Sequence, residues 1–141
     1  MTVGSTLTLS DADHYFGLEK KVYPTLAAGA TVVSSTANWT YGAYAVIVPA
    51  NTITNAFRVD ALSISSCNRD AVFQLELYQG AGDDIITAIR FAVEGGFFGN
   101  QVYIIGSEIV AANSQIRARV ASSNGAGAVA TLRVSIVYYA H

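Results

Sequence analysis

Charged residues are scarce in this chain: Asp, Glu, Lys and Arg together make up 13% of its 141 residues. Globular proteins usually carry about 25% charged residues, which keep the surface solvated. Either Ser, Thr, Asn and Gly cover much of the surface, or part of it is buried against partner molecules. The net charge of −2 argues against a general nucleic-acid-binding surface, which would be basic.

Cysteine and histidine are almost absent. Cys67 is the only cysteine, so no intrachain disulfide can form. A nucleophilic cysteine needs a histidine base, and the two histidines, His14 and His141, lie near opposite termini. We therefore predict that Cys67 is a small apolar filler at a strand end, that no catalytic metal or cofactor is bound, and that the protein is not an enzyme.

Long apolar runs are missing too, although 52% of the residues are hydrophobic. No run approaches the roughly 20 apolar residues that span a bilayer, so we expect no membrane partner. The N-terminal segment lacks a charged start followed by a long apolar core. We therefore expect no secretory signal, synthesis in a cytosol, and no glycosylation of the sequon at Asn38.

What the chain does contain, after residue 30, is a series of short β-forming runs. The candidate strands cover residues 30–36, 43–50, 57–65, 71–79, 84–93, 101–106, 114–122 and 129–140. Alternation is clear in the run 71–79, where Phe73, Leu75 and Leu77 share one face and Gln74 and Glu76 take the other. Runs 114–122 and 129–140 alternate in the same way. One buried face per run predicts strands of a half-buried sheet.

The connections between these runs carry turn residues. "QGAGDD" separates the fourth and fifth runs, and "NGAG" at residues 124–127 separates the last two, which predicts a hairpin at each. No convincing long amphipathic helix follows residue 30. The sequence therefore predicts an all-β fold, an antiparallel two-sheet sandwich that is most simply a jelly roll, with an immunoglobulin-like sandwich as the alternative.

Residues 1–30 read as a short irregular N-terminal arm in front of a sandwich domain at 31–141. Ser10 is a candidate cap for a short helical turn within this arm. Three aromatic residues are its candidate anchors: Tyr15, Phe16 and Tyr23. The arm can dock on its own sandwich, on a neighbouring subunit or on a larger assembly, and we expect one of the last two.

Glycines and acidic residues do not combine into a recognisable site. "GAGDD" is no phosphate loop, because a strand rather than a helix follows it. Calcium needs about six to eight oxygen ligands, and Asp83 and Asp84 have only Asp70 as a further candidate. Two other acidic sets carry weaker signals, and nothing in the sequence places two of their members across a cleft. They are the loose calcium-loop pattern Asp11, Asp13 and Glu19, and the possible glycosidase acids Glu76, Glu94 and Glu108.

Two further groups of residues point to binding. Trp39, Tyr41 and Tyr44 could stack on sugars, as in a carbohydrate-binding module, although a lone tryptophan favours a core or interface anchor. Three arginines lie opposite the apolar residues of the last two runs. If "NGAG" closes a hairpin, they form an oligomer-interface strip with the last run's outward side chains. The predicted strip is Arg117, Arg119, Arg133, Val137 and Tyr139.

Three stretches together resemble small virion structural proteins of tailed bacteriophages, of the head-decoration or minor-capsid kind. They are "EKKVYPTLAAGATVV…WTYGAYAVIVPANTITNAFRV", "FQLELYQGAGDDIITAIRF" and "VAANSQIRARVASSNGAGAVATLRVSIVYY". The resemblance implies an all-β fold, a homo-oligomer, often a trimer, and a place in the virion, where the protein covers, reinforces or attaches to a capsid. It supplies no catalytic residue. A carbohydrate-binding module and a glycoside-acting enzyme remain the rival readings.

Overall fold

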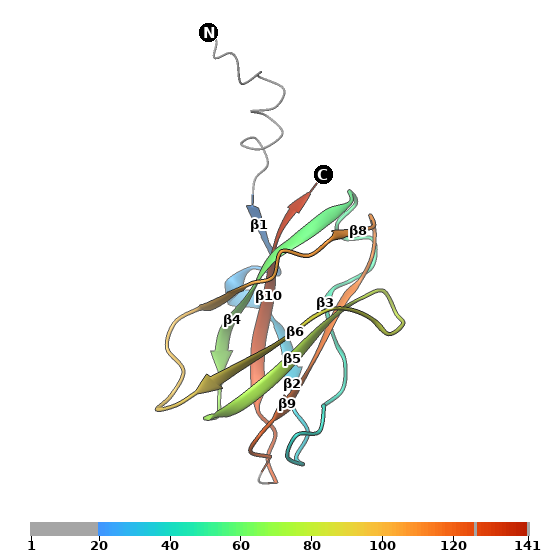
Figure 1. The fold of residues 1–141 in the computed structure, drawn as a ribbon. Coiled ribbons are helices and arrows are strands. Elements are labelled where there is room, and N and C mark those ends of the chain that lie inside the picture. The colour runs from blue at the N-terminus through green and yellow to red at the C-terminus, as the bar shows by residue number, and fades with distance from the viewer. Residues whose placement is uncertain (1–19, 126, 141) are drawn as a thin grey trace.

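The computed structural model describes residues 20–125 and 127–140, and almost all of their regular structure is β (Figure 1). The elements are β1 (Lys20–Tyr23), η1 (Leu26–Ala28, a 3-10 turn), β2 (Ala30–Val33), β3 (Ala45–Val48), β4 (Phe57–Cys67), β5 (Ala71–Gln79), β6 (Asp84–Val93), β7 (Gln101–Ile104), β8 (Ile109–Val110), β9 (Ile116–Ser122) and β10 (Thr131–Ala140). All eight predicted strands are present. No helix in the described part of the chain is long and apolar enough to cross a membrane.

The strands form two antiparallel sheets that pack as a sandwich (Figure 1). Sheet 1 has the order β1-β10-β4-β7, with β2 also on β10 and β8 also on β4; sheet 2 has the order β3-β9-β5-β6. The pairings are nested: β2 with β10, β3 with β9, β4 with β7 and β8, and β5 with β6. A long hairpin rolled up on itself gives this nesting, which is the jelly-roll topology. The jelly-roll prediction is confirmed, and the immunoglobulin-like alternative is not.

The core lies between the sheets and follows the predicted alternation. From sheet 2, Phe73, Leu75 and Leu77 are fully buried, as are Ile116, Ala118 and Val120. From sheet 1, the inward side chains of β10 are equally buried: Leu132, Val134 and Ile136. Each large apolar side chain contributes about 1.5–3 kcal/mol when it leaves water. Burial of these alternate side chains therefore fixes which residues of β5, β9 and β10 point away from the core.

One predicted hairpin is confirmed and the other is wrong. β5 and β6 pair directly across the "QGAGDD" turn, where Gly80 adopts a φ of 71°. The "NGAG" loop instead crosses between the layers, because β9 lies in sheet 2 and β10 in sheet 1. The Arg69 guanidinium holds this loop by donating to the carbonyls of Asn124, Gly125 and Ala128 at 2.7–2.9 Å. Asn and Gly favour a turn, but they do not decide which sheet the next strand joins.

Residues 20–30, which we assigned to the arm, contribute to the sandwich. β1 pairs with the end of β10, from Lys20 opposite Tyr139 to Tyr23 opposite Ile136. Tyr23 packs against the core of its own chain. The sequence did not predict β1, because its four residues begin with two lysines and show no alternation. It did not predict β8, because two residues are too few to show any. Tyr15 and Phe16 lie outside the described residues, so docking of the preceding segment on a neighbour stays a prediction.

Candidate interaction surfaces

The outer face of sheet 2 carries a cluster of arginine and tyrosine side chains. Arg117 and Arg119 point outward from β9 because the residues between and beside them fill the core. The segment before β3 runs along the β9 edge of this face, where Gly42 N donates to Val120 O at 3.1 Å. Gly42 is needed there, since a Cβ would lie 1.9 Å from the carbonyl oxygen of Val33.

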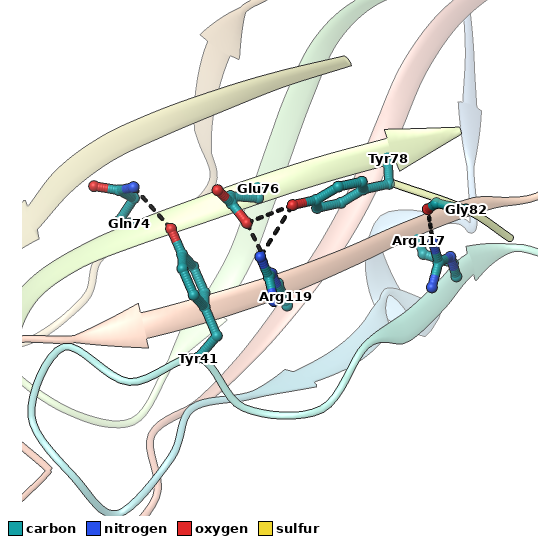
Figure 2. Close-up of polar contacts among 7 residues, drawn as sticks. All are labelled: Tyr41, Gln74, Glu76, Tyr78, Gly82, Arg117 and Arg119. Carbon is teal, nitrogen blue, oxygen red and sulfur yellow. Dashed lines mark hydrogen bonds and ion pairs between the residues drawn. The ribbon is translucent and has the colours of Figure 1, made fainter. Parts of the chain in front are cut away.

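Arg119 is the centre of this cluster (Figure 2). Its Nε lies 2.7 Å from Glu76 Oε1, and its Nη2 donates to Tyr78 Oη at 3.1 Å. Tyr78 in turn donates to the same carboxylate oxygen at 2.8 Å. The guanidinium also stacks on Tyr41, 4.3 Å from the ring centroid. The side chains of Arg119 and Glu76 are 28% and 14% exposed, so solvent screens this pair only in part.

The cluster changes the acidity of its members. Burial raises the pKa of Glu76, but hydrogen bonds from Tyr78 and Arg119 and the positive charge of Arg119 outweigh that effect and leave the pKa below its usual value. Burial and the hydrogen bond to the Glu76 carboxylate raise the pKa of Tyr78 to about 12. Glu76 is therefore held ionised and Tyr78 neutral, which suits a fixed ion pair rather than proton transfer.

Arg117 belongs to the same face but to a different set of contacts. Its Nε donates to Gly80 O at 2.9 Å, and its Nη2 donates to Gly82 O, which ties β9 to the β5–β6 turn (Figure 2). The guanidinium lies 4.2 Å from the centroid of the Tyr44 ring, and Tyr44 meets Tyr78 edge to face at 5.2 Å. The "GAGDD" turn is thus bound by an arginine of its own chain.

A second series of side-chain contacts on this face ends at Trp39. Gln74 Nε2 donates to Tyr41 Oη at 2.7 Å, and Arg90 Nη2 donates to Gln74 Oε1 at 2.6 Å. The Arg90 guanidinium lies 4.8 Å from the centroid of the Trp39 ring. The indole remains 46% exposed. Alternation predicted that Gln74 points outward, but only the pairing of β5 with β6 brings Arg90 to it.

The outer face of sheet 1 is different in kind. Pairing places four apolar residues side by side across β1, β10, β4 and β7. We call this set the apolar row: Val22, Val137, Ala61 and Ile104. Val22 is 40% exposed and Ile104 77% exposed, and Val102, two residues along β7, is 55% exposed. The Lys20–Asp60 ion pair, at 3.1 Å, lies on the neighbouring stretch of these strands.

The predicted arginine strip is divided between these two faces. Arg117 and Arg119 lie on sheet 2, whereas Arg133, Val137 and Tyr139 belong to β10 in sheet 1. The single strip is therefore wrong, because it required β9 and β10 to pair. An interface role for either half stays a prediction. Sequence reasoning also missed Val22, Ala61 and Ile104, which become neighbours only through long-range strand pairing.

The acidic candidates do not converge. Asp70 accepts hydrogen bonds from Gly95 N and Gly96 N at 2.8 and 3.0 Å, at the opposite end of β5 from Asp83 and Asp84. Within residues 20–125 and 127–140, no three His, Cys, Asp or Glu side chains gather as a metal site. Asp84 and Glu108 do line one cavity of about 270 Å³, together with apolar residues of β6 and β8. Asp11, Asp13 and Glu19 lie outside the described residues.

Cys67 has the environment of a filler. It ends β4, is half-buried, packs against the core and donates a hydrogen bond from Sγ to Arg69 O at 3.3 Å. Burial raises the pKa of its thiol, which lowers the fraction of nucleophilic thiolate. The only candidate histidine bases, His14 and His141, fall outside the described part of the chain.

Comparisons with known proteins give distant structural likenesses. No protein-family model and no curated protein matches the chain. Three solved structures of infectious bursal disease virus resemble it over 88% of its length. The Gx strain gives 12% identity and a TM-score of 0.41, the Gt strain 13% and 0.40, and the T13 viral particle 14% and 0.44. The chain spans only 31–32% of those viral chains, and we infer no function from likenesses this distant.

Proposed function

We propose that the protein is a non-enzymatic virion structural protein that self-associates through the outer face of sheet 1. The observation that carries the proposal is the apolar row. Its exposed members, with Val102, present apolar side chains on a sheet that is already packed on its inner side. Exposed apolar side chains gathered on one face mark interaction sites in soluble proteins.

The apolar row is bordered by polar groups, as association surfaces usually are. Its central member, Ala61, is only 2% exposed, so the apolar surface open to a partner lies at Val22 and, on β7, at Val102 and Ile104. Polar groups border it, namely the Lys20–Asp60 pair and Arg58 on β4. An apolar centre with a polar rim is typical of protein interfaces. The low charge content of the chain agrees with surface that is buried in the assembly.

The virion assignment is supported by the resemblance of three long stretches to phage decoration and minor-capsid proteins. The jelly-roll topology agrees with that resemblance. A trimer is the expected assembly, and attachment to capsid protein the expected role. The non-enzymatic reading is supported by acids that are engaged structurally: Glu76 by Arg119 and Tyr78, and Asp70 by two backbone amides.

Self-association is tested by placing a charge in the apolar row. Ile104→Lys, on the most exposed member, should lower the sedimentation mass from trimer toward monomer at micromolar concentration, because an unpaired ammonium would be desolvated in the interface. Val129→Lys is the matched control, since Val129 is 41% exposed on the crossing loop and outside the row. It should leave the mass unchanged. Circular dichroism should show the same β-signal in both variants.

Two results would contradict this reading. The first is a monomer mass for the unmodified chain at micromolar concentration, and the second is an Ile104→Lys variant that assembles as well as the unmodified chain. The virion assignment has its own test. Mass spectrometry of purified particles from the source culture should detect the protein in amounts comparable to known capsid proteins. Its absence from those particles would remove the virion assignment and leave the association test standing.

A further inference from the structure

Trp39 is held in an unfavourable backbone conformation with its side chain exposed. Its φ is 54°, in the left-handed region that a bulky residue rarely adopts, and such a conformation costs on the order of 1–3 kcal/mol. The fold nevertheless fixes it. Trp39 N donates to Ser122 O at 2.7 Å, and the neighbouring Asn38 Oδ1 accepts from Gly125 N at 2.6 Å. The fold thus maintains an unfavourable backbone conformation at the only tryptophan of the chain and leaves its side chain at the surface.

The groups beside Trp39 are polar and partly free to bind a ligand. Arg90 is exposed and uses Nη2 on Gln74, while its other N–H groups make no hydrogen bond within the described residues. Gln74 and Tyr41 are fixed by their mutual hydrogen bond. Ala88 and Ala92, on either side of Arg90 along β6, are exposed and too small to cover it. The result is an aromatic ring beside an oriented amide, a hydroxyl and a guanidinium.

The strands of this face carry a small net positive charge. The charged side chains of β5, β6 and β9 are three arginines (Arg90, Arg117 and Arg119) and two acids (Glu76 and the exposed Asp84), so they sum to +1 (three minus two). The whole chain carries −2. These strands therefore carry the opposite sign to the whole molecule. Next to Trp39 the positive charge is that of Arg90, which pairs with no carboxylate within the described residues, and it favours a carboxylate of the ligand.

We propose that the Trp39 face of sheet 2 binds an acidic saccharide, a sugar chain that carries carboxylates. The apolar C–H face of a pyranose ring would stack on the exposed indole. The sugar carboxylate would pair with Arg90, whose guanidinium suits bidentate contacts, while Gln74 and Tyr41 would bind ring hydroxyls. The site lies on the opposite side of the sandwich from the apolar row, so it does not depend on the proposed association.

The test uses the full chain and the fluorescence of its one tryptophan, which reports only on this site. Titration with a tetragalacturonate should give a saturable change in emission, and a neutral tetrasaccharide should bind at least about tenfold more weakly. Arg90→Gln should weaken tetragalacturonate binding about tenfold or more, as expected for a charged hydrogen-bonded pair. Calorimetry should show binding lost in Trp39→Ala. Arg133→Gln, an exposed arginine on sheet 1, is the matched control and should bind normally.

Ala88→Glu provides a second route if Arg90→Gln disturbs the fold. It places a carboxylate on the exposed β6 surface near Arg90 and should repel the acidic sugar. The proposal is overturned by the absence of any saturable signal up to about 10 mM tetragalacturonate. Equal binding of the neutral sugar, or unchanged binding in both Arg90→Gln and Trp39→Ala, would also overturn it. So would a fall in sedimentation mass in Trp39→Ala, since this face would then be a protein interface.

Discussion

Replacing Arg119 by alanine should destabilise the fold by about 3 kcal/mol, because it removes the centre of the sheet 2 cluster. The variant loses the 2.7 Å bond to Glu76, the bond to Tyr78 and the stacking on Tyr41. A hydrogen bond to a charged group contributes about 1.5–3 kcal/mol, and an exposed cation–aromatic contact about 0.5–1 kcal/mol. Breaking a fully buried pair costs roughly 3–5 kcal/mol, which sets the upper bound here because Arg119 is 28% exposed.

The measurement is urea denaturation at a fixed protein concentration, so that association contributes equally to every variant. With a slope of about 2 kcal/mol per molar urea, the midpoint of Arg119→Ala should fall by about 1.5 M. Arg133→Ala is the matched control. Arg133 is exposed and makes no side-chain hydrogen bond or ion pair within the described residues, so its midpoint should change little.

A double-mutant cycle with Glu76→Gln isolates the pair itself. The two substitutions touch each other, so their effects should not add, and the coupling should be about 1 kcal/mol or more. The reasoning is refuted if Arg119→Ala loses less than about 1 kcal/mol, the range of a solvated surface pair. It is also refuted if the coupling is zero, because the contacts seen on sheet 2 would then contribute nothing to stability.

Two further predictions concern backbone space and pH. Gly42→Ala should lower the free energy of unfolding in urea by about 3 kcal/mol, because its Cβ would meet the Val33 carbonyl. Gly82→Ala is the control, since an added Cβ there has nothing within 4 Å, and its stability should hardly change. Equal urea midpoints for the two variants would contradict this prediction. The lowered pKa of Glu76 stabilises the folded state above the unfolded value near 4.5, and this contribution is lost as the pH falls through the folded pKa. The difference in free energy of unfolding between the unmodified chain and Glu76→Gln should therefore become smaller below about pH 4.5. A difference that stays constant down to pH 3 would show that Glu76 does not titrate in this way.

The sequence by itself determined the strands and their buried faces. A period of two in runs such as 71–79 is a local property, since each strand must turn its apolar side to the core whatever it pairs with. The outward direction of Gln74, Glu76 and Arg119 followed from the same rule. The turn at "QGAGDD" was equally local, because a short connection between two long strands leaves them little choice but to pair.

Tertiary structure alone decided which strands became neighbours. The jelly roll pairs the first strands with the last, so β1 lies on β10 across more than a hundred residues of sequence. No local signal specifies a contact at that separation, and the apolar row exists only because of it. The same reason placed Arg133 on the opposite face from Arg119, although "NGAG" had favoured a hairpin. Turn chemistry fixes the direction of a few residues, whereas burial of the whole core selects the sheet that the next strand joins.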